Sequence, residues 1–158
     1  MDMKMPTPIE FELIETAPLF HELLNLRVEA GRHSIGVEHE VEHQQSPFWI
    51  CIRMKALATI DATPSLVNSS MIVATACVVK VTACHYAIED FLTLPAYRHL
   101  GLANILLGRM MDFIEMNCQV GDTVSISALG EDELLCAEYG FVRSHCASFG
   151  PNLLKRVE

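Results

Sequence analysis

The spacing of apolar and polar residues divides the chain into short strands and helices. Segments that alternate, or that are continuously apolar and β-branched, are typical of strands. The predicted strands cover 9–15, 48–57, 71–81, 86–94 and 122–129, and one or two more fall within 141–157. The segment 71–81, MIVATACVVKV, has the composition of a well-buried strand.

Four helices are predicted between these strands. In the first, Thr16 can act as the cap, Pro18 lies in the first turn, and Gly31 marks the end. The second is polar and runs over 34–45. A short helix near the C-terminus ends at Gly140, since glycine favours the position that follows a helix.

The longest predicted helix begins at Gly101 and is apolar on most of its circumference, which is typical of a helix laid on a sheet. Its predicted core positions are Leu102, Ile105, Leu106, Leu107, Met110, Met111, Phe113 and Ile114. A polar stripe remains at Asn104, Gly108, Asp112 and Glu115. The order of elements, β-α-α-β-β-β-α-β-α-β-β, predicts one three-layer α/β domain over 1–158.

Composition narrows the classes of function. Of the 158 residues 51% are hydrophobic, which is enough for a full core, and the formal net charge is −9 with only 11 Lys and Arg. A general nucleic-acid binder needs a basic face, so we expect no nucleic-acid partner. The charge is compatible with a cationic small molecule or a basic peptide, although acidity also serves solubility alone.

The cysteines and the N-terminal sequence favour a cytoplasmic protein. None of the six cysteines forms a C-x-x-C pair, and most lie in apolar runs, which is typical of reduced, buried thiols. The opening MDMKMPTPIEFE has no secretory pattern, and no apolar run approaches the roughly 20 residues that cross a bilayer. We therefore expect no membrane partner.

The segment LPAYRHLGLANILL joins a predicted strand to the long helix. Backbone N–H groups at a helix start lack partners and favour an anion, and Gly101 with the small Ala103 would let a phosphate approach closely. Arg98 is placed to add a charge-assisted contact. Because the pattern R-x-x-G-x-A is short, a tight strand–helix turn without a ligand remains the alternative from these residues alone.

The sequence HEVEH carries a different chemistry. On a helix, His39 and His43 would face the same way as zinc ligands with Glu40 as a base, so a zinc hydrolase is a remote alternative. The surrounding segment offers only Val37 and Val41 for burial, and no clear third ligand follows. A solvated, acidic helix is the favoured interpretation, and we expect no metal.

The block IEDFLTLPAYRHLGLANILLGRMMDFIE resembles the core of the GNAT superfamily of N-acetyltransferases, where an apolar strand ending in Pro precedes [QR]-x-x-G-x-[GA] and a long helix. The downstream ISALGEDELLCAEYGF resembles the second signature, which ends in a YEKYGF-like phrase, and LRVEAG near the N-terminus is similar too. The resemblance covers about 88–141. It implies a mixed, mostly antiparallel sheet, splayed between its fourth and fifth strands and flanked by about four helices.

The resemblance also implies acetyl-CoA as the cosubstrate. The residues implied to bind its pyrophosphate are Arg98, His99, Leu100, Gly101, Leu102 and Ala103. The residues implied to meet its pantetheine arm, which would pair like an extra strand within the splay, are Leu92, Thr93 and Leu94.

The catalytic candidates come from two places. Glu89 and Asp90 are charged residues in an otherwise apolar strand, so each is a candidate base, and a structural cap is the alternative for Asp90. In many GNAT enzymes a tyrosine of the last helix protonates the leaving thiolate. Cys136 stands at that position here, and Tyr139 follows three residues later. Either is a candidate acid, and simple packing is the alternative for both.

These expectations describe an N-acetyltransferase that moves an acetyl group from acetyl-CoA to a primary amine of a small molecule or peptide, by direct transfer in a ternary complex. A catalytically degenerate acyl-CoA-binding or scaffold protein of the same fold is the alternative, because the usual tyrosine is missing. The acceptor has no readable motif. Edge strands near the C-terminus often pair in this family, so a homodimer is an additional expectation.

Overall fold

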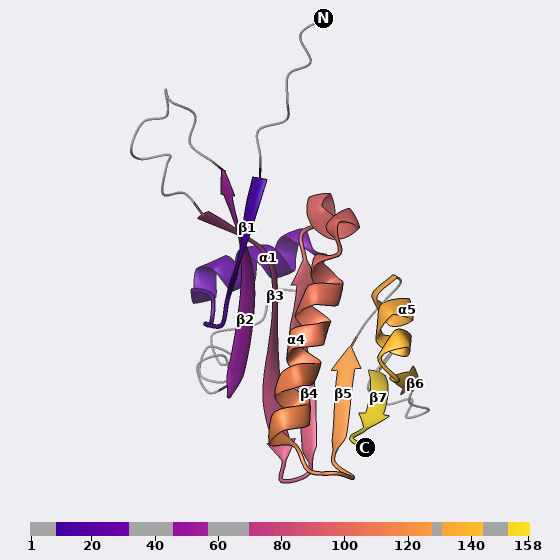
Figure 1. The fold of residues 1–158 in the computed structure, drawn as a ribbon. Coiled ribbons are helices and arrows are strands. Elements are labelled where there is room, and N and C mark those ends of the chain that lie inside the picture. The colour runs from indigo at the N-terminus through magenta and orange to yellow at the C-terminus, as the bar shows by residue number, and fades with distance from the viewer. Residues whose placement is uncertain (1–8, 32–45, 57–69, 128–130, 144–151) are drawn as a thin grey trace, which may run out of the picture.

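A computed structural model describes residues 9–31, 46–56, 70–127, 131–143 and 152–158. Within these ranges, seven strands form a single sheet that carries helices on both faces (Figure 1). The predicted polar helix over 34–45 and the HEVEH motif lie outside the described residues, so both stay predictions.

The predicted strands and helices that fall within the described ranges are present and follow the predicted order. The strands are β1 Ile9–Ile14, β2 Phe48–Ala56, β3 Ser70–Thr82, β4 His85–Thr93, β5 Thr123–Ser127, β6 Val142–Arg143 and β7 Asn152–Arg156. The helices are α1 Phe20–Glu29, the 3-10 helix η1 Pro95–Leu100, α4 Leu102–Asn117 and α5 Glu131–Glu138. In the part of the chain that the structure describes, no helix combines the length and apolar character needed to cross a bilayer.

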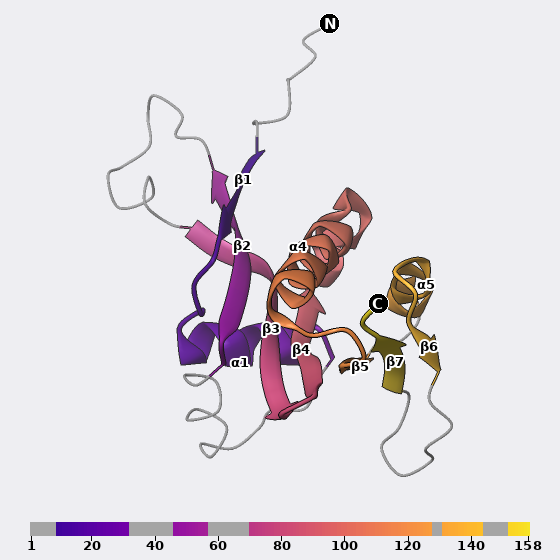
Figure 2. The same ribbon diagram turned by 60° about the horizontal axis from the view of Figure 1, so that its bottom comes forward.

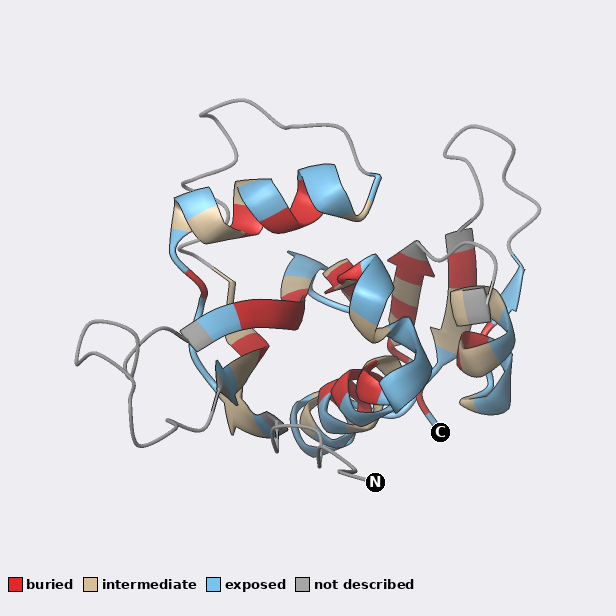
Figure 3. Cartoon of the chain, turned by 90° about the horizontal axis from the view of Figure 1, so that it is seen from above, coloured by how far each residue is buried: buried red, intermediate tan, exposed pale blue. Residues whose placement is uncertain are grey.

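The sheet has the strand order β1-β2-β3-β4-β5-β7-β6, and only β4 and β5 run parallel. Two further views of the chain show that α1 covers one face of the sheet while α4 and α5 cover the other (Figures 2 and 3). The central strand β3 is therefore buried on both faces, without a break over 72–78. This arrangement explains its continuous apolar sequence and confirms the mixed, mostly antiparallel sheet.

The contact between β4 and β5 is short. His85–Ile88 pairs with Thr123–Ile126, and the pairing stops there, while β4 continues over Glu89–Thr93 beside β3. The predicted splay between the fourth and fifth strands is thus present. In its second half, β4 has one strand partner among the described residues instead of two.

Helix α1 begins later than the sequence predicted. Its first residue is Phe20 and Leu19 is its N-cap, so the prediction that Thr16 caps the helix is wrong. Glu22 accounts for the difference, because its carboxylate accepts the backbone N–H of Leu19 at 3.2 Å and holds the first turn there. The same carboxylate receives both Nη atoms of Arg53 on β2, at 2.8 and 3.0 Å, and this guanidinium lowers the pKa of Glu22.

Helix α4 buries one face against the sheet. Leu106, Met110 and Ile114 are completely buried, which confirms most of the predicted core positions. Ile105 is the exception: the prediction placed it in the core, but 47% of it is exposed. The sheet covers only one side of the helix, and the apolar residues of the helix extend beyond that side.

We predict that Leu106→Ala lowers the free energy of unfolding by about 2–5 kcal/mol, because the substitution leaves a cavity at a fully buried site. The matched control is Ile105→Ala, the preceding and exposed position of the same helix, which should change stability by no more than about 0.5 kcal/mol. Urea denaturation measures both. Equal losses would contradict the orientation of α4.

Candidate functional site

Strand β4 contains a bulge where it leaves β5. Thr75 of β3 pairs with Leu92 and Cys77 pairs with Glu89, so β4 has one residue more than β3 between these pairs. At the bulge, Asp90 has φ 50°, and it is the one non-glycine residue with positive φ among those described. Bulges bend a strand and redirect its neighbours, so this one marks the start of the open edge.

The backbone beyond the bulge has a defined direction. The N–H of Leu94 donates to the carbonyl of Val73 at 2.8 Å, and the carbonyl of Leu94 accepts the N–H of Tyr97 at 2.9 Å. Both backbone groups of Leu94 therefore already have partners within the chain. Successive residues of an extended strand direct their backbone groups to opposite sides, so those of Thr93 face away from β3 and toward the open edge.

The open edge of β4 runs directly into the N-terminus of α4. Helix η1 follows β4, and Gly101 then takes φ 74° and ψ 16°, the left-handed conformation that a side chain disfavours. Among the described residues no side chain caps α4, and the first amides of α4 have no acceptor within the helix. A Cβ added at Gly101 would meet no atom of the described residues within 4 Å, so the space on that side of Gly101 is open.

The other residues of this loop follow a simple pattern of burial. Arg98, His99 and Leu100 are exposed around the helix start, whereas Leu102 is buried at 3% exposure and anchors the first turn on the core. The predicted strand–turn–helix is thus present, with a 3-10 turn inserted. Unpartnered amides, a helix dipole and an exposed arginine make this end of α4 suitable for an anion.

Cys136, one candidate acid, lies inside the hydrophobic core with no exposed surface. Burial, helped by the nearby charges of Asp132 and Glu133, raises the pKa of its thiol to about 12. A thiol in this setting stays protonated and packs as an apolar group. This position favours the packing alternative for Cys136.

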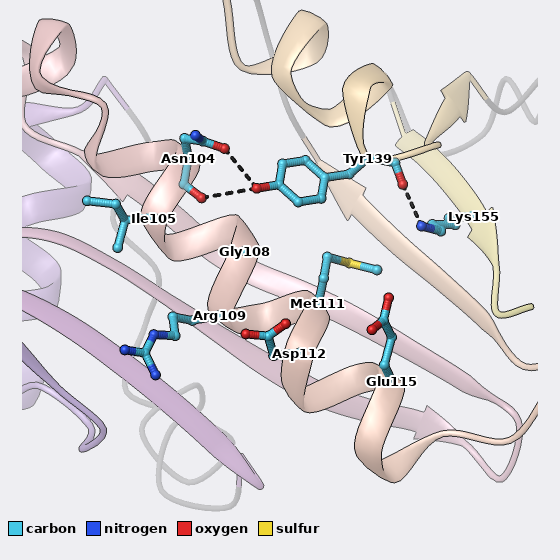
Figure 4. A pocket seen from close by; sticks show the side chains of 9 residues that line it. All are labelled: Asn104, Ile105, Gly108, Arg109, Met111, Asp112, Glu115, Tyr139 and Lys155. Carbon is cyan, nitrogen blue, oxygen red and sulfur yellow. Dashed lines mark hydrogen bonds between the residues drawn. The ribbon is translucent and has the colours of Figure 1, made fainter.

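Tyr139, the other candidate acid, lies across the first turns of α4. Its hydroxyl donates to Oδ1 of Asn104 at 2.8 Å, with the carbonyl of Asn104 at 3.4 Å, and it lies beside Gly108 (Figure 4). Lys155 of β7 donates to the carbonyl of Tyr139 at 2.5 Å. Tyr139 therefore links α5 and β7 to the start of α4, and its single proton is already engaged.

A pocket of about 450 Å³ lies along this face of α4 (Figure 4). Its lining residues are Asn104, Ile105, Gly108, Arg109, Met111, Asp112, Glu115, Tyr139 and Lys155. The polar stripe predicted from the sequence of the helix supplies four of the nine residues. The stripe thus lines a hollow between α4 and the C-terminal residues Tyr139 and Lys155.

The two candidate bases have different environments. Both carboxylate oxygens of Asp90 are occupied by Arg27 of α1, with Nε at 2.6 Å and an Nη at 2.7 Å. Glu89, one residue earlier, is exposed where β4 leaves β5. The structural alternative for Asp90 is a cap on nearby backbone N–H groups. In the structure, its partner is instead the side chain of Arg27.

Arg27 was missed in the sequence, although a signal for it was present. It follows Leu23 by four positions, so helical spacing puts this arginine on the apolar face of α1. A charged residue at such a position requires a buried partner.

Within the described residues, no group of three His, Cys, Asp or Glu side chains is arranged to hold a metal.

Comparison with known proteins links this geometry to one fold. No protein-family model matches the chain, and no curated protein matches it. A solved protein of meticillin-resistant Staphylococcus aureus, described as a probable acetyltransferase, superposes with a TM-score of 0.71 at 15% identity and covers 89% of this chain and 96% of its own. Ard1 from Thermoplasma volcanium gives a TM-score of 0.65 at 14% identity, over 94% of this chain and 98% of its own.

An acetyltransferase of the GNAT family from Staphylococcus aureus Mu50 also matches, with a TM-score of 0.59 at 14% identity, over 94% of this chain and 100% of its own. These identities are low, so the likeness concerns the fold. The chain has the GNAT fold, as the resemblance of its sequence motifs implied.

We predict that stability falls as the pH rises from about 8.5 toward 12, in part because of the buried thiols. Burial raises the pKa of Cys136 to about 12 and also raises the pKa of Cys77, so the unfolded chain loses these protons first as the pH rises. The stabilisation is complete below about pH 8.5 and is lost as the pH rises toward the folded pKa values.

Urea midpoints at pH 8 and pH 10 measure the loss. Cys136→Ala should make it smaller, whereas the same change at the exposed Cys84 should leave it unchanged. An equal loss in wild type and Cys136→Ala would show that Cys136 is not the buried group that titrates.

Proposed function

We propose that the protein is an acetyl-CoA-dependent N-acetyltransferase that acylates a primary amine of a small molecule or peptide. The observation that carries the proposal is the junction between the open edge of β4 and the uncapped N-terminus of α4. A CoA thioester has an amide-bearing arm and a pyrophosphate. Within the described part of the chain, the junction supplies strand groups without a partner strand for the first and helix amides without a cap for the second.

The fold supports the same conclusion. Of the solved structures described above, one is described as a GNAT-family acetyltransferase and another as a probable acetyltransferase. All three chains match this one over nearly their full length. Fold alone does not define an activity, so the proposal also depends on the loop Arg98–Ala103. In that loop Gly101 keeps the approach to the amides open, and the exposed Arg98 adds a positive charge beside them.

We infer a direct transfer within a ternary complex. The amine nitrogen attacks the thioester carbonyl, a C–N bond forms, and the C–S bond breaks to release the CoA thiolate. The amine loses one proton to a base, and the thiolate takes one from an acid or from solvent. Alignment of the two reactants supplies much of the rate, about 7–11 kcal/mol for well-oriented groups.

Among the candidate bases we favour Glu89, acting directly or through water. It is exposed at the point where the strands separate, so an amine or a water molecule can reach it. Asp90 is largely buried against Arg27. Neither candidate acid has an exposed proton that is free to transfer. Cys136 is buried, and the hydroxyl of Tyr139 donates to Asn104. We therefore propose that solvent protonates the leaving thiolate.

The buried Cys136 also favours a second candidate, a protein of the same fold that binds acyl-CoA without turnover. Calorimetry with acetyl-CoA and a thiol-release assay with polyamines, arylalkylamines, aminoglycosides, amino sugars and basic peptides separate the two. Binding with thiol release supports the enzyme, and binding without release supports the second candidate. Absence of binding would exclude both.

We predict that Gly101→Glu weakens acetyl-CoA binding by at least about tenfold, because it adds a carboxylate at the N-cap of α4 that would repel the pyrophosphate. The matched control is Gly121→Glu. Gly121 also has positive φ and open space around it, but it lies beyond the other end of α4. Calorimetry should therefore show near-normal affinity for the control. Equal affinity in both variants would place the pyrophosphate elsewhere.

A further inference from the structure

The ion pair between Arg27 and Asp90 joins the last turn of α1 to the bulge of β4. Nε and one Nη of the guanidinium contact the two carboxylate oxygens at 2.6 and 2.7 Å. The side chains are 6% and 14% exposed. A two-point contact of this kind fixes the direction of the carboxylate as well as its distance, so it fixes the residue that carries it.

Asp90 needs such a restraint. Its φ of 50° belongs to the left-handed region, which is unfavourable for a residue with a side chain and is tolerated best by Gly, Asn and Asp. The bulge that includes Asp90 begins directly after Glu89, which follows Ile88, the last residue of β4 that pairs with β5. The strained residue, the bulge and the opening of the strands therefore coincide.

The remaining nitrogen of Arg27, Nη1, is buried, and it has no hydrogen-bond partner within the part of the chain that the structure describes. A buried donor without a partner is unfavourable. An apolar side chain would pack on α1 without this cost, so stability alone does not account for an arginine here. Its contact with Asp90 is the compensating feature.

We propose that Arg27 is a positioning residue that holds the Asp90 bulge and thereby keeps the edge of β4 open for the acyl donor. The inference rests on the proposed function, because it assigns the open edge to the pantetheine arm of acetyl-CoA. Arg27 acts through Asp90 and the backbone of β4, and it does not contact the reacting atoms. Asp90 is then a structural partner and not the base.

The first test compares two ion pairs of the same kind. Arg27→Met removes the guanidinium at the bulge. Arg53→Met removes the guanidinium that binds Glu22 at the other end of α1, where both side chains are 19% exposed. Calorimetry with acetyl-CoA and urea denaturation are run on both variants and on wild type. We expect Arg27→Met to weaken binding by about tenfold or more and Arg53→Met to change it by less than about threefold.

A rescue variant keeps the test valid if Arg27→Met folds poorly. Arg27→Met with Asp90→Gly removes the unpaired buried carboxylate and puts glycine where positive φ is needed. This double variant should bind acetyl-CoA within about threefold of wild type. Affinity in Arg27→Met equal to that of wild type, or a double variant no better than Arg27→Met, would overturn the inference.

Asp90→Asn separates positioning from base chemistry. Asparagine tolerates positive φ and still accepts a hydrogen bond from Arg27, but it cannot take a proton. The expected result is a kcat within about tenfold of wild type and an unchanged pH profile, with any loss in KM for acetyl-CoA. A kcat lower by about a hundredfold or more, with a lost limb of the pH profile, would instead identify Asp90 as the base.

The two levels of the proposal fail in different ways. Wild-type protein that does not bind acetyl-CoA would overturn the proposed function and this inference with it. Wild-type protein that binds acetyl-CoA, with Arg27→Met binding equally well, would overturn the role of Arg27 alone.

Discussion

Strand β4 has to satisfy two different neighbours, and most of the features of the site follow from that constraint. It pairs with β3 along its length but with β5 only over His85–Ile88. A single extra residue at Asp90 redirects the strand, and Pro95 ends it soon afterwards. The open edge and the start of α4 are thus brought together by one short stretch of backbone.

Ion pairs fix the position of α1 on the sheet. Helix α1 is joined to the sheet at both ends by an arginine–carboxylate pair, Glu22 with Arg53 and Arg27 with Asp90. Buried pairs contribute less to stability than apolar packing does, but they penalise any shift that would separate the charges. In an acidic chain with few basic residues, two of its arginines are used in this way.

Helix α5 and the residue that follows it contact both the core and the start of α4. Cys136 enters the core, while Tyr139 reaches the first turn of α4 through Asn104. The residue that aligns with the usual acid thus lies in the core, and the nearby phenol donates a hydrogen bond to the first turn of α4. In the proposed reaction, the rate then depends on alignment of the reactants more than on an acid from this helix.

Local patterns were sufficient for the strands and for α1, α4 and α5 within the described residues, and for their order along the chain, because spacing and glycine positions act over a few residues. They did not predict the 3-10 helix η1 before Gly101. They failed where the outcome depends on distant partners. The helix does not begin at Thr16, because Glu22 holds the first turn at Leu19. The apolar Ile105 lines a pocket instead of packing on the sheet. The partner of Asp90 lies 63 residues away on another element, so only the tertiary structure could show that Arg27 binds its carboxylate.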